Sequence, residues 1–390
     1  MKANYNLWIF AGETSGDVYG ANLAKSLKET NTNIKISGMG GNAMKSEGVD
    51  ILVDSTELGV VGIVEVLKNI FKFIKIFKGL VKEAVKQRPD AVILIDYPGF
   101  NLRFAKQMHN HNIPVIWYVS PQIWVWGKKR IHKLNKYCNK MLVIFPFEVD
   151  VYKNTKLDAE FVGHPLVDIV KAKLDPNIKR DLNKILLLPG SRHSEVTRVF
   201  SPMLETAKIL HERNPNLKFK ISAARPTLKL IIDRILDEFY KKYPNSDLRF
   251  EIGCGNNLAL LQECGTGLSK SGTITVEAAI AGIPLVVFNI LNPLTFLLAR
   301  IIVKKLFRNS FTMPNIIANK TIYEEFLQKE ATPESLAIAV EKILPNGERR
   351  TMVENEIKNL SENMLTFGKT EASKNTAAAV LKTIDALSAN

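Results

Sequence analysis

Short apolar runs alternate with longer amphipathic stretches along the chain, and this alternation predicts its fold. In the first half, the apolar runs lie at residues 7–11, 34–38, 91–95, 115–119 and 140–144. Continuous apolar runs of about five residues are typical of parallel strands that helices cover on both faces. Because helix-like stretches separate the runs, the pattern predicts an α/β fold with a doubly wound parallel sheet.

The same pattern begins again after Val162-Gly163-His164-Pro165, which predicts a second domain. Its expected strands lie at residues 184–188, 218–222, 248–252 and 284–288. A chain of 390 residues is long enough for two cores of common size. We therefore expect a Rossmann-like domain at residues 1–168, a second one at 169–345, and a helical tail at 346–390 that packs back onto the first domain.

The excess of positive charge narrows the range of expected partners. Lys and Arg number 53 against 39 Asp and Glu, which gives a net charge of +14. Such a surplus favours phosphorylated substrates, an acidic membrane surface or nucleic acid. Nucleic acid is not expected, because the chain has no arginine-rich tail, zinc-finger spacing or RNP-like signature. Three cysteines without a CxxC pair argue against disulfides and zinc and fit a reducing cytoplasm.

One stretch, residues 62–86, combines lysines with large apolar side chains at helical spacing. The lysines recur every three or four residues, and Phe, Ile, Leu and Val fill much of the remainder. The stretch could be an interfacial helix, with its lysines at lipid phosphates and its apolar side chains among acyl chains. It could equally be a crossover helix that covers the sheet. Residues 294–307 have a weaker form of the same pattern.

Two loops of the second half carry groups that suit a nucleotide diphosphate. Pro189-Gly190-Ser191-Arg192 follows an apolar strand, where Arg192 could pair with phosphate oxygens or be a solvated residue of a turn. Ser271-Gly272-Thr273 opens a predicted helix, whose free amides suit phosphate. Glu277 lies one turn further and could accept from ribose hydroxyls or complete a capping box. The arginine and the helix start together are more specific than either alone.

The first half has its candidate groups at the ends of two predicted strands. Asp96 follows the strand at 91–95, so it should lie at the carboxyl edge of the sheet, as a general base or as a helix-capping residue. Glu13, Ser15 and Gly16 lie in the turn after the first strand, where they could contact a phosphate or a sugar hydroxyl. The chain has neither a P-loop nor a GxGxxG motif, and no clustered metal ligands or Ser-His-Asp arrangement. No cofactor and no metal are therefore expected.

A series of short segments, spread over almost the whole chain, matches the pattern of one enzyme family. In order, they are Ala11-Gly12-Glu13-Thr14-Ser15-Gly16-Asp17, Gly62-Ile63-Val64-Glu65-Val66-Leu67, Tyr118-Val119-Ser120-Pro121, Trp124-Val125-Trp126, Pro146-Phe147-Glu148, Val162-Gly163-His164-Pro165, Leu188-Pro189-Gly190-Ser191-Arg192, Ser271-Gly272-Thr273 with Glu277, and Met313-Pro314-Asn315. In this order and at these spacings, they make the chain resemble the lipid-A-disaccharide synthase family of glycosyltransferases.

The resemblance implies a GT-B fold, with two Rossmann-like domains facing a cleft and C-terminal helices crossing back. It implies an inverting, metal-independent transfer of 2,3-diacylglucosamine from its UDP donor to the 6-hydroxyl of 2,3-diacylglucosamine 1-phosphate (lipid X). The products would be the β-1,6-linked disaccharide 1-phosphate and UDP. The resemblance also implies peripheral attachment to the cytoplasmic face of an anionic inner membrane, and a homodimer with exchanged C-terminal segments.

The resemblance also implies roles for individual residues. Asp96 corresponds to the family's essential aspartate and Arg192 to its essential arginine. Ser271-Gly272-Thr273 would contact the diphosphate, Glu277 would face the ribose, and Asn315 would lie near the nucleotide. The residues that match the membrane-docking, acyl-binding region are Val64, Val66, Leu67, Ile70, Phe71, Phe73, Ile74 and Phe77.

The chain departs from the family in one motif. The family often has Pro-Asp-Phe-Asn after the aspartate, whereas this chain has Pro98-Gly99-Phe100-Asn101. The second acidic residue is therefore absent from this position, which makes Asp96 the stronger candidate for the base.

Two other interpretations stay open on the sequence. A GT-B enzyme acting on UDP-N-acetylglucosamine, such as a cell-wall glycosyltransferase or a 2-epimerase, would accept unacylated substrate and would not need the basic apolar helix. A non-catalytic peripheral membrane protein that binds sugar nucleotides would attach to membranes without transferring a sugar. No apolar run reaches the about 20 residues of a spanning helix, so a soluble or peripheral protein is expected.

Overall fold

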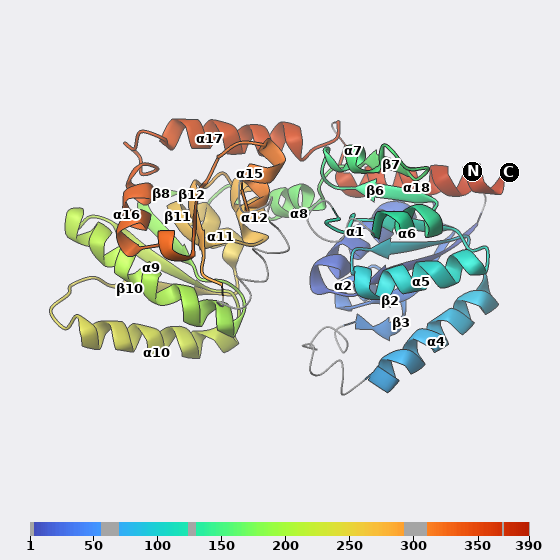
Figure 1. Cartoon of the computed structure of the whole chain (residues 1–390), viewed down its shortest axis with the longest axis horizontal. Helices are drawn as coiled ribbons and strands as arrows, with labels where there is room; N and C mark the ends of the chain where they lie inside the picture. Colours follow the sequence, from blue (N-terminus) through green and yellow to red (C-terminus); the bar gives the residue numbers. More distant parts are fainter. Residues whose placement is uncertain (1–3, 56–69, 124–129, 292–309, 369, 390) are drawn as a thin grey trace. The chain divides into compact units, whose positions relative to one another are not determined.

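The computed structural model describes residues 4–55, 70–123, 130–291, 310–368 and 370–389. It divides into two compact units, Met1–Pro165 with Leu365–Asn390, and Leu166–Met364 (Figure 1). Each unit contains one open parallel sheet with helices packed against it. The expected class of two Rossmann-like domains is thus confirmed.

The sheet of the first unit has the strand order β3-β2-β1-β4-β5-β6-β7, with every pair parallel. Its strands are β1 (Tyr5–Ala11), β2 (Ile34–Gly40), β3 (Asp50–Asp54), β4 (Ala91–Ile95), β5 (Val115–Tyr118), β6 (Lys140–Val143) and β7 (Asp158–Phe161). The central strands β4 and β5 are buried over their whole length, as their apolar runs predicted. The edge strands β3 and β7 were not predicted, because they are half exposed and lack a continuous apolar run.

Helices of the first unit cover its sheet. They are α1 (Thr14–Thr30), α2 (Asn42–Ser46), α4 (Ile70–Gln87), α5 (Pro98–Asn110), α6 (Arg130–Tyr137), α7 (Glu148–Tyr152) and α18 (Ala372–Ser388), while α8 (Pro165–Lys173) begins at the boundary of the units. Trp8, Phe104 and Trp117 are fully buried in the core beneath α4, α5 and α6. The last helix, α18, packs along α1, and the Tyr5 hydroxyl donates to Asp385 Oδ1 at 2.7 Å (Figure 1). The C-terminal helix therefore belongs to the first unit.

The second unit repeats this design with the strand order β10-β9-β8-β11-β12-β13, again all parallel. Its strands are β8 (Asp181–Leu188), β9 (Lys218–Ala223), β10 (Phe250–Cys254), β11 (Cys264–Lys270), β12 (Leu285–Asn289) and β13 (Glu324–Leu327). Its helices are α9 (His193–Arg213), α10 (Pro226–Lys242), α11 (Asn257–Glu263), α12 (Ile274–Ile280), α15 (Met313–Ala318), η2 (Gln328–Glu330), α16 (Pro333–Glu341), α17 (Arg350–Asn359) and η3 (Leu360–Met364). The expected strand at 248–252 is β10, which begins two residues later.

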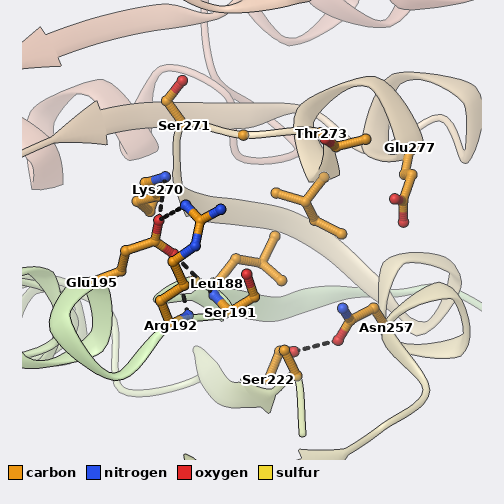
Figure 2. Close-up of a pocket in the computed structure, with 14 residues that line it drawn as sticks. Leu188, Ser191, Arg192, Glu195, Ser222, Asn257, Lys270, Ser271, Thr273 and Glu277 are labelled. Carbon is orange, nitrogen blue, oxygen red and sulfur yellow. Dashed lines mark hydrogen bonds and ion pairs between the residues drawn. The ribbon is translucent and has the colours of Figure 1, made fainter. Parts of the chain in front are cut away.

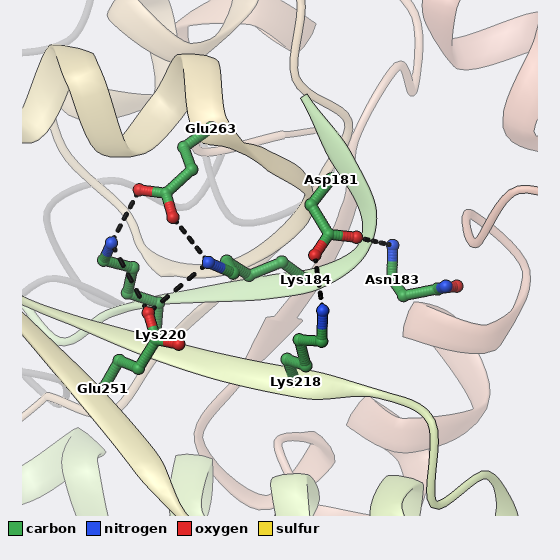
Figure 3. A network of polar contacts seen from close by, with 7 residues as sticks. All are labelled: Asp181, Asn183, Lys184, Lys218, Lys220, Glu251 and Glu263. Atoms are coloured by element: carbon green, nitrogen blue, oxygen red, sulfur yellow. Dashed lines mark hydrogen bonds and ion pairs between the residues drawn. The ribbon is translucent and has the colours of Figure 1, made fainter. Parts of the chain in front are cut away.

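Ion pairs link side chains on three neighbouring strands of this second sheet (Figure 3). Glu263 accepts from Lys184 at 2.5 Å and from Lys220 at 2.6 Å, and Glu251 lies 3.4 Å and 3.6 Å from the same two ammonium groups. The lysines come from β8 and β9, and the carboxylates from β10 and the end of α11. Because Lys184, Lys220 and Glu263 are partly buried and form a network with the more exposed Glu251, they stabilise the strand order more than isolated surface pairs would.

The chain returns to the first unit at Leu365, whereas the returning tail was expected to begin at residue 346. Helix α17 stays with the second unit because Arg350, at its start, is buried there. The Arg350 guanidinium donates to the carbonyl of Gly265 at 2.8 Å and to the Thr266 hydroxyl at 3.0 Å, both in β11. Of the described helices beyond residue 346, α18 is the one that packs on the first unit.

Each sheet has a point where the strand order reverses, between β1 and β4 in the first unit and between β8 and β11 in the second. In open parallel sheets, ligands bind beyond the carboxyl ends of the strands at such a switch point. The loops after β1 and β4 carry Glu13 and Asp96, and those after β8 and β11 carry Arg192 and Ser271. The fold therefore brings the predicted motifs to the ligand-binding edges of their sheets.

Candidate functional site

A cavity of about 280 Å³ lies at the switch point of the second unit, between the loops that follow β8 and β11 (Figure 2). Five residues predicted from the sequence line it, namely Arg192, Ser271, Gly272, Thr273 and Glu277. They come from segments that are about 80 residues apart in sequence but follow adjacent parallel strands. The structure therefore brings the proposed nucleotide-binding residues of this unit together, with one exception described below.

The loop after β8 is folded around the carboxylate of Glu195. Glu195 Oε2 accepts from the backbone amides of Ser191 at 3.2 Å and Arg192 at 3.3 Å, which caps the start of α9. Gly190 has a φ of +112°, and a Cβ there would lie 2.7 Å from Glu195 Oε2. Glycine is therefore required by both the backbone conformation and the close approach of this carboxylate.

Two cations share the other oxygen of Glu195. Lys270 Nζ lies 3.0 Å and Arg192 Nη1 3.2 Å from Glu195 Oε1. Burial would raise the pKa of the Glu195 carboxyl, but the ion pair with Lys270, the loop amides and Arg192 together hold it below its usual range. The carboxylate therefore stays ionised inside the cavity and fixes both cations at its wall.

The loop after β11 forms the opposite wall. The Ser271-Gly272-Thr273 turn leads into α12, and burial raises the pKa of the Glu277 carboxyl one turn later, an effect that Lys173 partly offsets. Thr273, at the N-cap position, makes no side-chain capping hydrogen bond. The cavity thus combines the two cations around Glu195 with hydroxyl groups, a helix start and the Glu277 carboxyl, a combination suited to an anionic, hydroxylated ligand.

Asn315 does not line this cavity. Its amide is buried at the start of α15, where Oδ1 accepts from the backbone amides of Ile322 and Tyr323 at 2.8 Å and 2.9 Å. Its Nδ2 group donates to the Tyr323 carbonyl and to Glu325, each at 2.8 Å. These contacts hold the segment before β13, so the side chain of Asn315 has a structural role in this conformation.

Asp96 directly follows β4 at the switch point of the first unit. The backbone bends sharply there, because both Asp96 and Tyr97 have left-handed φ values, of 44° and 46°. Buried Asn101 supports the bend by donating to the carbonyls of Ile95 at 3.1 Å and Asp96 at 2.8 Å. The strained conformation turns the Asp96 carboxyl out at the strand end.

The pKa of the Asp96 carboxyl is raised well above its usual value. Desolvation by the surrounding protein and, to a smaller extent, the negative charge of Glu13 raise the pKa of Asp96 to about 6, although part of the Asp96 side chain is exposed. The backbone amide of Tyr97 opposes this change more weakly. A carboxylate with a pKa near the working pH is suited to act as a general base.

Residues of the turn after β1 have different positions relative to Asp96. Glu13 is near enough for its charge to raise the pKa of Asp96, and Gly12 packs so closely on Tyr97 that a Cβ would lie 2.2 Å from the ring. Ser15 is exposed and Gly16 is buried at the start of α1. Asp17 points away, to the start of α2, where it accepts from the amides of Gly41 and Ala43 at 2.7 Å and 2.9 Å.

A groove of about 930 Å³ runs between α4 and α5 in the same unit. Its apolar lining includes Phe73, Ile74 and Phe77 from the predicted acyl-binding residues, and Tyr97 and Phe100 from the other side. Phe77 meets Phe100 edge to face, with ring centroids 5.4 Å apart. The cationic residues on the groove are Lys78, Lys82 and Arg103. An apolar floor with cationic residues suits an acyl chain that carries an anionic head.

Part of the predicted acyl-binding region lies outside the described residues. Val64, Val66 and Leu67 are not among the described residues, and Ile70 and Phe71 are described as part of α4 without their side chains. The second basic apolar segment, residues 294–307, also lies outside them. None of the helices in the described part is long and apolar enough to cross a membrane.

Several residues of these sites were not predicted from the sequence. Glu195 and Lys270 were not singled out, although Glu195 stands three residues after Arg192, at the capping-box position, and Lys270 directly precedes Ser271. Ser222 and Asn257, which meet at 2.5 Å on the cavity wall, had no sequence signal. The described ranges hold no group of three or more His, Cys, Asp or Glu side chains that could bind a metal ion.

Comparison with known proteins identifies the same family as the sequence motifs do. Residues 7–380 match the model of the Lipid-A-disaccharide synthetase family. Lipid-A-disaccharide synthase of Trichlorobacter lovleyi is 35% identical over 363 residues, covering 91% of this chain and 92% of that protein. The enzyme of the same name from Coxiella burnetii (strain CbuK_Q154) is also 35% identical, over 360 residues, covering 90% of this chain and 92% of that protein.

Solved structures resemble the fold at much lower identity. The structure of UDP-GlcNAc 2-epimerase from Neisseria meningitidis bound to UDP-GlcNAc has a TM-score of 0.62 and 13% identity, covering 98% of this chain and 99% of that one. This likeness shows the fold alone, two Rossmann-like domains in one chain. The family assignment rests on the family model and on the relatives at 35% identity. The chain belongs to the lipid-A-disaccharide synthase family of glycosyltransferases.

Proposed function

We propose that the protein transfers 2,3-diacylglucosamine from UDP to the 6-hydroxyl of lipid X, with inversion, giving the β-1,6-linked disaccharide 1-phosphate and UDP. The observation that carries the proposal is the convergence of Arg192, the Ser271-Gly272-Thr273 turn and Glu277 on one cavity at a switch point. UDP is a ligand of matching chemistry, because its diphosphate would meet the cationic wall and the helix start, and its ribose the Glu277 carboxylate.

Asp96 is the proposed base. Its carboxylate would take the proton of the 6-hydroxyl as that oxygen attacks the anomeric carbon, while Arg192 and the amides of the turn stabilise the departing UDP. The raised pKa of Asp96 supports this assignment, because a base with a pKa of about 6 is largely ionised at neutral pH and is still able to hold a proton.

The groove between α4 and α5 is the proposed site for an acyl chain and for contact with the cytoplasmic face of the inner membrane. Its apolar lining supports acyl binding, and Lys78, Lys82 and Arg103 support contact with phosphate groups of lipid. The net charge of +14 is consistent with attraction to an anionic surface. We further propose, from the family resemblance alone, a homodimer with exchanged C-terminal segments.

The experiment is a transfer assay with purified protein, UDP-2,3-diacylglucosamine and radiolabelled lipid X in mild detergent, without added metal. We expect formation of the labelled disaccharide. No product together with intact UDP binding would reject the proposal and favour an enzyme of unacylated UDP-sugars or a binding protein. Conversion of UDP-N-acetylglucosamine in a parallel reaction would identify the first of these.

Two variants test the base. Asp96→Asn should lose turnover while it retains UDP binding, because the amide cannot accept the proton. Asp150→Asn is the matched control: it removes an exposed carboxylate of the same unit, paired with Lys153 at 2.7 Å, and should keep normal turnover. Near-normal turnover of Asp96→Asn would reject Asp96 as the base but would leave the transfer reaction itself unaffected.

A further inference from the structure

Lys270 is a partly buried cation on the wall of the cavity in the second unit. It is the last residue of β11, directly before the Ser271 turn, and its side chain is 18% exposed. Figure 2 shows its ammonium group and the Arg192 guanidinium converging on the carboxylate of Glu195. Neither the motifs nor the family resemblance assigned a role to this lysine.

The three side chains leave one positive charge in excess. Two cations share Glu195 Oε1, while Glu195 Oε2 is occupied by the two loop amides. Arg192 is largely exposed, with 76% of its side chain accessible, so water screens its charge. Lys270 is screened less, because it is mostly enclosed by protein, and its charge acts more strongly on an anion in the cavity.

A structural role alone would not require this arrangement. A single cation would neutralise Glu195, and the loop amides already satisfy its second oxygen. The second cation instead adds positive charge beside the helix start at Ser271-Gly272-Thr273, where an anionic group of a ligand is expected. The carboxylate is held at four points, so it can fix the direction of both cationic groups.

We infer that Lys270 is a further diphosphate-binding residue of this cavity and that Glu195 is the residue that positions Lys270 and Arg192 for the phosphates. The inference rests on the proposed function, because it takes a nucleoside diphosphate as the ligand. Lysine is suited to this role as a compact, strongly charged donor to phosphate oxygens. Glu195 does not touch the ligand; it acts through the two cations.

The first test measures binding of UDP by calorimetry and of uridine by ligand-observed NMR, with the wild-type protein and Lys270→Met. The variant should bind UDP about tenfold more weakly, the effect of losing one hydrogen bond to a charged group. Uridine binding should be unchanged, because uridine has no phosphate. The salt dependence of UDP binding should also become shallower.

Lys208→Met is the matched control. Lys208 lies on α9 of the same unit, is 23% exposed and is paired with Glu212 at 2.6 Å, but it does not line the cavity. The control should bind UDP as the wild type does. Lys270→Arg, which keeps the charge, should retain most of the affinity, and comparison of thermal unfolding with the wild type should show that each variant is folded.

Glu195→Gln tests the positioning role. Glutamine can still cap α9, but it no longer pairs with the two cations. If Glu195 acted only through its charge, its removal would strengthen UDP binding, because the cavity would become more positive. We expect weaker UDP binding instead, because Lys270 and Arg192 lose their common anchor; tighter binding by Glu195→Gln would overturn the positioning role.

The outcomes separate this inference from the proposed function. A wild-type protein that binds neither UDP nor uridine would contradict the proposed function. Normal UDP binding by Lys270→Met would overturn the inference and leave the proposed function standing. An equal loss of UDP and uridine binding would also overturn it, because a phosphate contact must discriminate between the two ligands.

Discussion

The raised pKa of Asp96 predicts the pH dependence of the proposed transfer, and Glu13 is the residue through which it can be altered. The structure raises this pKa from 3.8 to about 6, with burial as the larger cause and the charge of Glu13 as the second. The base must be ionised, so the rate should fall about tenfold for each pH unit below about 6. Glu13→Gln removes only the second cause, so the acid side of the pH–rate profile should move to lower pH, by up to about one pH unit.

The assay is kcat/KM of disaccharide formation between pH 4.5 and 8.5 for the wild type and the variant. The acceptor's own phosphate also titrates near pH 6, so the wild-type profile alone does not show which group causes the fall in rate at low pH. The difference between the two proteins does, because both act on the same acceptor. Below pH 6 the variant should therefore lose less of its maximal rate than the wild type.

Glu29→Gln is the matched control, because Glu29 is an exposed carboxylate at the far end of α1, the helix that begins directly after Glu13. Its profile should coincide with that of the wild type. An acid limb that stays in place in Glu13→Gln, or that moves equally in both variants, would refute the reasoning: Glu13 would then not control the titrating group, and Asp96 would not be that group.

Three other substitutions test separate parts of the account. Ile74→Glu should weaken binding to vesicles containing anionic lipid by about tenfold or more in sedimentation assays, because Ile74 is 45% exposed on the apolar groove; unchanged binding would exclude this face from membrane contact. Arg350→Met should destabilise the protein by about 3 kcal/mol in urea unfolding, because buried carbonyl groups lose their donor, whereas the exposed Arg213→Met should have a much smaller effect. Asp17→Ala should cost about 2 kcal/mol in the same measurement, because three amides at the start of α2 lose their acceptor; wild-type stability would contradict this.

The central strands could be predicted because burial on both faces makes them continuous apolar runs. β4 and β5 are of this kind, and their positions were predicted to within a residue. Three of the four edge strands, β3, β7 and β13, could not be recognised in this way, since each is partly exposed and has no apolar run as long as those of the central strands. The fourth edge strand, β10, was predicted to begin two residues too early. The place where the chain returns to the first unit was also missed, because it depends on the burial of Arg350 against β11, a contact between segments about 85 residues apart.

The motifs of the cavity could be predicted because they end apolar strands, and strand ends of a parallel sheet meet at one edge. What could not be predicted is how they interact. Glu195 meets Lys270 only because β8 and β11 are neighbours, and periodicity does not specify which strands are neighbours. Asn315 shows the opposite limit: its motif suggested a ligand contact, but its side-chain hydrogen bonds go to Ile322, Tyr323 and Glu325, just before and within β13.

The two interpretations of the basic apolar helix turn out to be compatible in the described part of α4. Leu80 and Ala84, four residues apart, are buried in the core beneath the helix, as in any crossover helix. Ile74, Lys78 and Lys82, also four residues apart, form another stripe that is exposed along the groove. Because the stripes are separate, substitutions on the exposed one can test the proposed lipid binding without disturbing the core, and substitutions on the buried one cannot. The apolar side chains of this helix are therefore divided between the core, where Leu80 and Ala84 lie, and the groove, which Phe73, Ile74 and Phe77 line.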